Sequence, residues 1–136
     1  MPVMICGSLA YDHVMVFEGR FKDHILPDSI HMLSVSFLVP QLRRNFGGVA
    51  GNIAYNLSLL GVQSEMLATV GEDFDSYERW LQQCGISCRY VERIPGSYTA
   101  QAYITTDLDD NQITAFHPGA MFHTASHAVP RSGISI

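Results

Sequence analysis

The chain has 136 residues, of which 47% are hydrophobic and 15% are charged, and its formal net charge at pH 7 is −5. This length predicts one domain with a hydrophobic core, and the composition excludes an intrinsically disordered chain. The acidic balance and the scattered Lys and Arg residues argue against a nucleic-acid-binding surface. No apolar run approaches the ~20 residues that cross a bilayer, so we expect no membrane partner.

The cysteines and the first residues indicate the compartment. Cys6, Cys84 and Cys88 are too few for a disulfide framework, and the start, MPVMICGSLAYD, lacks the basic n-region of a signal peptide. We therefore expect a cytoplasmic protein. Cys84 and Cys88 are spaced as zinc ligands, as are His123 and His127, but the cysteines fall at apolar packing positions, and we predict no metal site.

The first part of the chain contains two kinds of predicted strand. Residues 3–6 form a continuous apolar run that ends at Gly7, as in a strand buried on both faces of a parallel sheet. From His31 to Val39, apolar residues alternate with Ser34 and Ser36, which predicts a strand with one exposed face.

Helices and buried strands alternate through the middle of the chain. Apolar residues between 53 and 60 recur at helical spacing and predict a helix that ends at Gly61. Asp75 and Glu78 resemble a capping box at the start of a second helix. The remaining predicted elements are a strand at 65–70, the second helix up to Gly85 and a strand at 86–91. This order, with short connections, predicts a right-handed parallel α/β sheet.

A pair of alternating strands follows. They span residues 99–105 and 113–117, and the turn residues between them predict a hairpin. We expect Asp107, Asp109 and Asp110 in this turn to form a solvated acidic loop.

Several residues have side chains or positions suited to ligand binding. Gly47 and Gly48 lie directly before the first predicted helix, where glycine allows a close backbone approach and the helix start offers free N–H groups to a polar ligand. Asp12 follows the first strand, where parallel sheets bind ligands, and its carboxylate can accept hydrogen bonds from two sugar hydroxyls. Asn52 can both donate to and accept from a sugar. The alternatives are a flexible loop for the glycines, a turn or cap for Asp12 and a cap or solvated residue for Asn52.

Taken in order, these segments form a family pattern. GSLAYD at residues 7–12 is followed by GGVAGNIAYNLSLLG at 47–61 and by ATVGEDFDS at 68–76. The pattern resembles the ribokinase-like (PfkB) carbohydrate kinase family over about residues 3–121. Within that family, GSLAYDHVMVFEGRF and the later ITAFHPGAM are most similar to the bacterial adenosine-kinase-like members.

The resemblance implies an α/β fold, a three-layer ribokinase-like parallel sheet with a small β-sheet lid, incomplete at the C-terminus. The kinase part would span residues 1–121, with lid strands within about 14–45 and 98–118. Residues 122–136, which have weak periodicity and end in Pro, Gly and Ser residues, would be an atypical tail from truncation or a frameshift.

The resemblance also implies the roles of the site residues. Asp12 would bind the sugar diol, Gly47 and Gly48 would hinge the lid, and Asn52 would contact the sugar. Phe116 is a candidate for packing a nucleobase, with an ordinary core role as the alternative. Closure of the lid would exclude water from phosphoryl transfer.

One part of the family pattern has no counterpart in this sequence. The second signature, a late Gly-Ala-Gly-Asp-like anion hole with the catalytic base, is missing. We therefore expect no catalytic residue in this chain, and we expect ATP and Mg²⁺ to bind the complete kinase mainly through segments that this chain lacks.

We predict a sugar or nucleoside kinase, with adenosine as the best substrate and the primary ribose hydroxyl as the acceptor of the ATP γ-phosphate. This chain would hold the substrate-binding part and be inactive alone. The alternative is a non-catalytic sugar-binding or dimerisation module in which the lid forms a homodimer. A dinucleotide-dependent oxidoreductase is disfavoured because no G-x-G-x-x-G follows the first strand.

Overall fold

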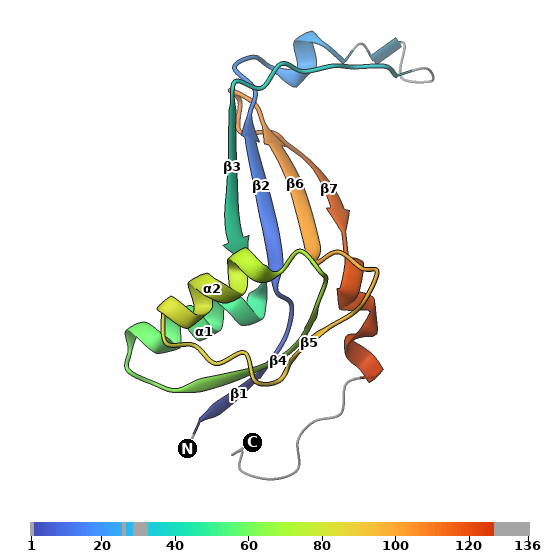
Figure 1. The fold of residues 1–136 in the computed structure, drawn as a ribbon. Helices are drawn as coiled ribbons and strands as arrows, with labels where there is room; N and C mark the ends of the chain where they lie inside the picture. Colours follow the sequence, from blue (N-terminus) through green and yellow to red (C-terminus); the bar gives the residue numbers. More distant parts are fainter. Residues whose placement is uncertain (1, 26, 29–32, 127–136) are drawn as a thin grey trace. The chain divides into compact units, whose positions relative to one another are not determined.

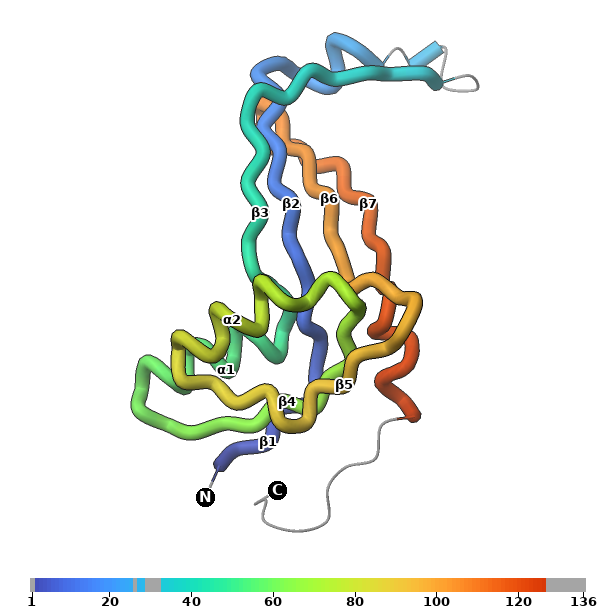
Figure 2. The backbone as a smooth tube through the Cα atoms, in the orientation of Figure 1, coloured from blue at the N-terminus to red at the C-terminus, as the bar shows by residue number. Residues whose placement is uncertain are grey.

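The structure, a computed structural model, describes residues 2–25, 27–28 and 33–126. The chain forms two compact units, and Figure 2 traces its path through both. Unit 1 comprises Met1–Tyr11, Phe46–Gln101 and His117–Ile136, and unit 2 comprises Asp12–Asn45 and Ala102–Phe116. Each unit is therefore assembled from segments that are far apart in the sequence.

Unit 1 contains the predicted parallel sheet. Its strands are β1 (Val3–Cys6), β4 (Ser64–Val70) and β5 (Val91–Arg93), in the order β1-β4-β5. The α/β prediction is confirmed for this unit. The predicted strand at 86–91 is wrong, because there only Ser87 forms a bridge, to Glu65, before the chain turns into β5.

The helices α1 (Val49–Leu59) and α2 (Asp75–Gln83) lie on one face of this sheet (Figure 1). The strand residues Ile5, Met66, Ala68 and Val70 pack against the helices and are buried, as are the helix residues that contact them. Together with a ring cluster they form the core of unit 1: Ile5, Leu9, Tyr11, Ala50, Ala54, Met66, Ala68, Val70, Phe74, Tyr77, Leu81 and Ile86.

The predicted end of α1 is confirmed, whereas the predicted start of α2 is wrong. Gly61, with φ +74°, follows the C-cap of α1. The N-cap of α2 is Phe74, and no side chain caps it. Asp75 and Glu78 do not form a capping box, because both carboxylates bind Arg93 of β5, each at 2.7 Å.

The opposite face of β4 is covered by a 3₁₀ segment, η3 (Gly119–Ser126). The Thr69 hydroxyl donates to the Ala120 carbonyl at 2.7 Å. The tail predicted at 122–136 falls partly in η3, and its residues 127–136 lie outside the described part of the chain. Among the described residues, no helix is long and apolar enough to cross a membrane.

Unit 2 is built on a four-stranded sheet in the order β3-β2-β6-β7, with some strand ends belonging to unit 1. The bounds are β2 (Ala10–Val16), β3 (Gln41–Gly47), β6 (Ala100–Thr106) and β7 (Gln112–His117). The strands predicted at 99–105 and 113–117 correspond to β6 and β7.

The strand predicted from His31 to Val39 is wrong. Residues 33–39 have no regular structure, residues 31–32 lie outside the described part, and the strand begins at Gln41. The reason is packing: the Phe37 ring lies 4.8 Å from Phe17 and 5.1 Å from Phe21, the latter in the short helix η1 (Phe21–Asp23). Within the alternating pattern of residues 33–39, the Phe37 ring packs on Phe17 and Phe21, and the segment does not form a face of the sheet.

The hairpin turn between β6 and β7 differs from the expected solvated loop. Asp107 is only 5% exposed, and its carboxylate accepts hydrogen bonds from the N–H groups of Phe21, Asp109 and Asn111. Burial raises the pKa of Asp107, but these hydrogen bonds outweigh it and lower the pKa to about 2. Asp109 forms ion pairs with Arg20 and Lys22 of the η1 region.

Asp107→Asn is expected to lower the stability of the chain at pH 7, because the amide cannot accept all these hydrogen bonds. The folded pKa of about 2 lies below the ordinary value of 3.8, so the stabilisation is present above about pH 4 and is lost as the pH falls towards 2. Thermal unfolding at pH 7, 4 and 2.5 measures this, and the variant should lose less stability than the wild type over that range.

The matched control is Asp110→Asn in the same turn. Asp110 has φ +59°, a conformation that Asn tolerates, and its side chain forms none of these bonds. Equal acid sensitivity in the wild type and Asp107→Asn would contradict the role given to Asp107.

Candidate functional site

The glycine pair before α1 is held tightly within unit 1. Gly48 has φ +90°, and a Cβ there would lie 2.5 Å from the Ser8 carbonyl oxygen and 2.8 Å from the Ala10 nitrogen. The Gly47 carbonyl accepts a buried hydrogen bond of 2.8 Å from the Tyr77 hydroxyl. Glycine is thus required at 48 by both backbone conformation and lack of space, and the segment is not a loose loop.

The start of α1 is already partly capped. The Ser8 hydroxyl accepts from the Val49 N–H at 3.1 Å, and the Ser8 carbonyl accepts from the Ala50 N–H at 3.0 Å. The Asn52 N–H donates to the Gly48 carbonyl. The prediction that this helix start offers free N–H groups to a ligand is therefore wrong for Val49 and Ala50.

Asn52 lies in the first turn of α1, and its side chain is exposed. Gly47, Gly48 and Asn52 are consequently neighbours in unit 1, as their spacing in the sequence requires. Asp12 and Phe116 belong to unit 2.

Contacts between β2 and β6 fix which residues share a face of the unit 2 sheet. The rings of His13 and Tyr103 stack at 4.5 Å and 7°, and the Phe17 N–H donates to the Thr106 carbonyl. The paired residue numbers rise together, so β2 and β6 are parallel, and Asp12 lies beside Ala102 on the face opposite the stacked rings.

The hairpin extends this row to β7. The Asp107 N–H donates to the Asn111 carbonyl, and counting back along both strands places Phe116 opposite Ala102. Asp12, Ala102 and Phe116 therefore point from the same face, in three adjacent strands. With a strand spacing of ~4.8 Å, the two outer backbone positions are about 10 Å apart.

The environment of these two outer residues differs. Asp12 is half-buried, and burial raises the pKa of its carboxyl above the ordinary value of 3.8, an effect that the charge of His13 partly offsets. Phe116 is 53% exposed. A carboxylate and an uncovered ring, separated by the small side chain of Ala102, can bind a ligand with polar hydroxyls at one end and a flat apolar group at the other.

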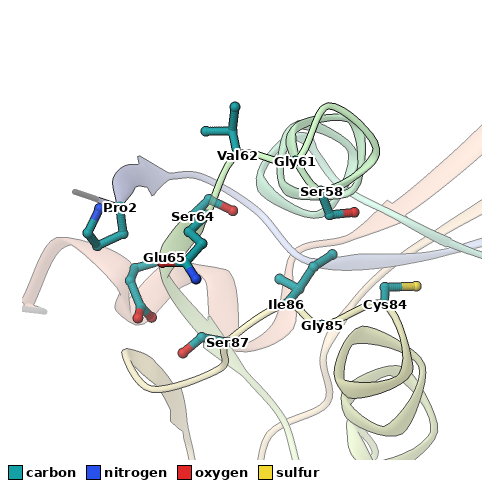
Figure 3. A pocket seen from close by; sticks show the side chains of 11 residues that line it. Pro2, Ser58, Gly61, Val62, Ser64, Glu65, Cys84, Gly85, Ile86 and Ser87 are labelled. Atoms are coloured by element: carbon teal, nitrogen blue, oxygen red, sulfur yellow. The ribbon is translucent and has the colours of Figure 1, made fainter.

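A hollow of about 370 Å³ lies elsewhere in unit 1, at the amino-terminal end of β4 and the C-terminal ends of α1 and α2 (Figure 3). It contains none of the predicted site residues. Ligands of open α/β sheets bind at the carboxyl ends of the strands, whereas this hollow lies at the opposite end of β4. Its one carboxylate, Glu65, makes no metal site alone, and among the described residues no three His, Cys, Asp or Glu side chains cluster to hold a metal.

The sequence model of the pfkB family carbohydrate kinases matches residues 8–132. The chain belongs to this family. The predicted resemblance is confirmed, and so is the ribokinase-like fold: the crystal structure of the Methanocaldococcus jannaschii nucleoside kinase, described as an archaeal member of the ribokinase family, superposes with a TM-score of 0.82 at 32% identity. That match covers 98% of this chain and 42% of the archaeal chain.

Two further comparisons concern nucleoside kinases. In sequence, the Methanocaldococcus jannaschii nucleoside kinase is 40% identical over 92 residues, which cover 66% of this chain and 30% of that protein. The nucleoside kinase of Burkholderia thailandensis, solved in complex with inosine, matches with a TM-score of 0.77 and 52% identity over 92% of this chain and 39% of the Burkholderia chain. This chain thus spans less than half the length of these pfkB family relatives.

Three contributors to the site were not singled out from the sequence. Ser8 caps α1, Tyr77 holds the Gly47 carbonyl, and Ala102 separates Asp12 from Phe116. Ser8 carries no local signal for this role, because the helix that it caps begins at Val49, 41 residues further along the chain. Tyr77 and Ala102 depend on contacts between distant segments.

Gly48→Ala is expected to destabilise the chain by more than ~1 kcal/mol, because alanine combines an unfavourable φ with a clash against backbone atoms. The control is Gly61→Ala, where φ is +74° but nothing lies within 4 Å of the added Cβ. Urea unfolding should show a clearly larger loss for Gly48→Ala. Equal losses would mean that the close approach to Ser8 contributes nothing.

Proposed function

We propose that this chain is the substrate-binding part of a nucleoside kinase, with adenosine as the preferred substrate. In the complete enzyme, the ATP γ-phosphate would be transferred to the primary ribose hydroxyl. Family membership supports the phosphotransferase class, and the names of the relatives support a nucleoside.

One arrangement supports a nucleoside most directly: the row Asp12, Ala102 and Phe116 on one sheet face. Asp12 would accept hydrogen bonds from the ribose diol, and Phe116 would pack against the base. Ala102 leaves space between them for the bond that joins sugar and base. A free sugar would use Asp12 alone and leave the Phe116 ring uncovered, so this row favours a nucleoside over ribose.

Asn52 would contact the sugar, and Gly47 and Gly48 would form the hinge of the lid. The lid itself would consist of strands within residues 14–45 and 98–118. The side chain of Asn52 is exposed, so its amide can form a hydrogen bond with the sugar.

Kinases of the ribokinase family use ATP, and Mg²⁺ is expected with it. The described residues do not fit a site for these groups. The α1 N–H groups of Val49 and Ala50 are bonded to Ser8, and no cluster of metal-ligating side chains occurs in the described part of the chain. We therefore propose that the catalytic base and the ATP site belong to a part of the enzyme outside these 136 residues. The chain alone would bind nucleoside without phosphorylating it.

Asp12→Asn is expected to weaken adenosine binding by at least about tenfold, because one acceptor oxygen is replaced by an NH2 donor and the other loses its charge. Folding should not suffer. Burial raises the Asp12 pKa, so ionisation costs stability above that pKa, and a neutral Asn removes the cost. Calorimetric titration with adenosine, inosine and ribose, combined with thermal unfolding at pH 7, separates the two effects. Unchanged affinity would remove Asp12 from the site.

Two further variants are compared in the same titration. Ala102→Leu fills the space between Asp12 and Phe116 and should weaken adenosine binding more than ribose binding. Asp110→Asn, which removes a carboxylate from the hairpin turn of unit 2, should change neither. Steady phosphorylation of adenosine by the purified chain with ATP and Mg²⁺ would contradict the proposal that this chain binds nucleoside without phosphorylating it.

A second candidate function, a sugar-binding or dimerisation module, is favoured by one observation. β7 is an edge strand of the four-stranded sheet and all six of its residues are exposed, which leaves its backbone open to a strand from a second lid. Sedimentation that shows only monomer at high concentration would exclude this homodimer. We also propose a reducing, cytoplasmic setting, in keeping with the three unbonded cysteines.

A further inference from the structure

The strand β3 runs beside β2 (Figure 1), and two contacts fix how their residues pair. A Cβ at Gly48 would meet the backbone on either side of Leu9, so Gly48 lies opposite Leu9. The rings of Tyr11 and Phe46 are 5.9 Å apart. From the first pair to the second, β2 advances by two residues and β3 goes back by two, as in an antiparallel ladder without a bulge.

This register places Asn45 directly opposite Asp12. Tyr11 and Phe46 pack in the core of unit 1, and the adjoining residue on each strand points from the other face of the sheet. These adjoining residues are Asp12 and Asn45, so their side chains lie beside each other, with Cβ atoms about 5 Å apart. The row that runs through Asp12 therefore continues onto β3.

The amide of Asn45 has no partner in the part of the chain that the structure describes, and the side chain is exposed. An exposed Asn on a sheet face is ordinary by itself. This one, however, lies at the end of a row that already contains an acceptor for sugar hydroxyls and a ring for a base.

Asn45 and Asp12 offer complementary groups to a sugar. A hydroxyl has one proton to donate and two lone pairs that accept, whereas an ionised carboxylate only accepts. Asp12 can therefore bind the protons of a diol, but it leaves the lone pairs of the diol oxygens without a donor. The NH2 group of Asn45, one strand away, supplies such a donor.

The order of the row indicates which hydroxyl Asn45 would meet. With the base on Phe116 and the bond between sugar and base above Ala102, the ribose ring extends towards Asp12 and Asn45. C1′ of the ribose carries the base, C2′ follows it and C3′ is one atom further away. The 3′-hydroxyl would therefore lie nearer to Asn45 than the 2′-hydroxyl.

We propose that Asn45 is a second residue of the diol site, whose amide donates to the 3′-hydroxyl and makes the site specific for nucleosides that carry this group. The inference rests on the proposed nucleoside-binding function. It adds to that function a residue on a fourth strand and a substrate feature that this residue recognises.

Calorimetric titration of the 136-residue chain and of its Asn45→Ala variant with adenosine, 2′-deoxyadenosine and 3′-deoxyadenosine tests this role. The substitution should weaken the binding of adenosine and of 2′-deoxyadenosine by about fivefold, the effect of one hydrogen bond between neutral groups. It should weaken the binding of 3′-deoxyadenosine by less than about twofold, because this ligand lacks the acceptor for the Asn45 amide.

Gln41→Ala is the matched control. Gln41 is exposed and projects from the same face of β3, four residues from Asn45, or about 13 Å along the strand. Its substitution should change none of the three affinities. Thermal unfolding should be the same for the wild type and both variants.

Equal weakening of all three ligands by Asn45→Ala, or weakening of none, would overturn the role of Asn45. So would a loss that disappears with 2′-deoxyadenosine instead of 3′-deoxyadenosine. If the wild type binds adenosine and Asp12→Asn weakens that binding, these results count against Asn45 alone and the proposed function stands. A wild-type chain that does not bind adenosine would overturn both.

Discussion

The segment that follows β1 and the segment that connects β3 to α1 contact each other at Ser8 and Gly48. The Cβ position of Gly48 is occupied by the Ser8 and Ala10 backbone, and the Ser8 hydroxyl and carbonyl cap the first turn of α1. Tyr77 adds a hydrogen bond to the Gly47 carbonyl and places its ring against Phe46 at 4.7 Å. The start of α1, the ring cluster and the position of Asn52 all depend on this contact, since a side chain at 48 would separate the segments.

Several carboxylates that the sequence suggested were free for ligands or solvent are likewise bonded to groups of the protein itself. The Asp107 carboxylate links the hairpin to the η1 region by accepting a hydrogen bond from the Phe21 N–H. Asp75 and Glu78 form ion pairs with Arg93. These carboxylates are satisfied within the protein. Asp12 is different, because its pKa is raised by burial and its partners do not compensate. Because burial destabilises the ionised form of this half-buried carboxylate, hydrogen bonds donated by a ligand would stabilise it.

Local patterns predicted the elements that depend on neighbours in sequence. The strands β1 and β4, the end of α1 at Gly61 and the β6–β7 hairpin follow from apolar periodicity and turn residues. The prediction that the first strand is buried on both faces is wrong, because Ile5 is its one buried residue. The sequence pattern also led correctly to the family. It failed where a distant partner decides the outcome: Arg93 takes the carboxylates of the expected capping box, and the Phe17–Phe21–Phe37 cluster removes the expected strand before Gln41. The row formed by Asp12, Ala102 and Phe116 requires the sheet order β2-β6-β7, which no local signal specifies.

We propose above all that the unit 2 sheet binds a nucleoside along Asp12, Ala102 and Phe116. Amide chemical shifts of the isotope-labelled chain, recorded during titration with adenosine, test it most directly. We predict saturable shifts at residues 12–14, 102–104 and 114–116, together with 47–52, and none around the hollow lined by Gly61 and Ser87. Shifts confined to that hollow, or no shifts at all, would contradict the account.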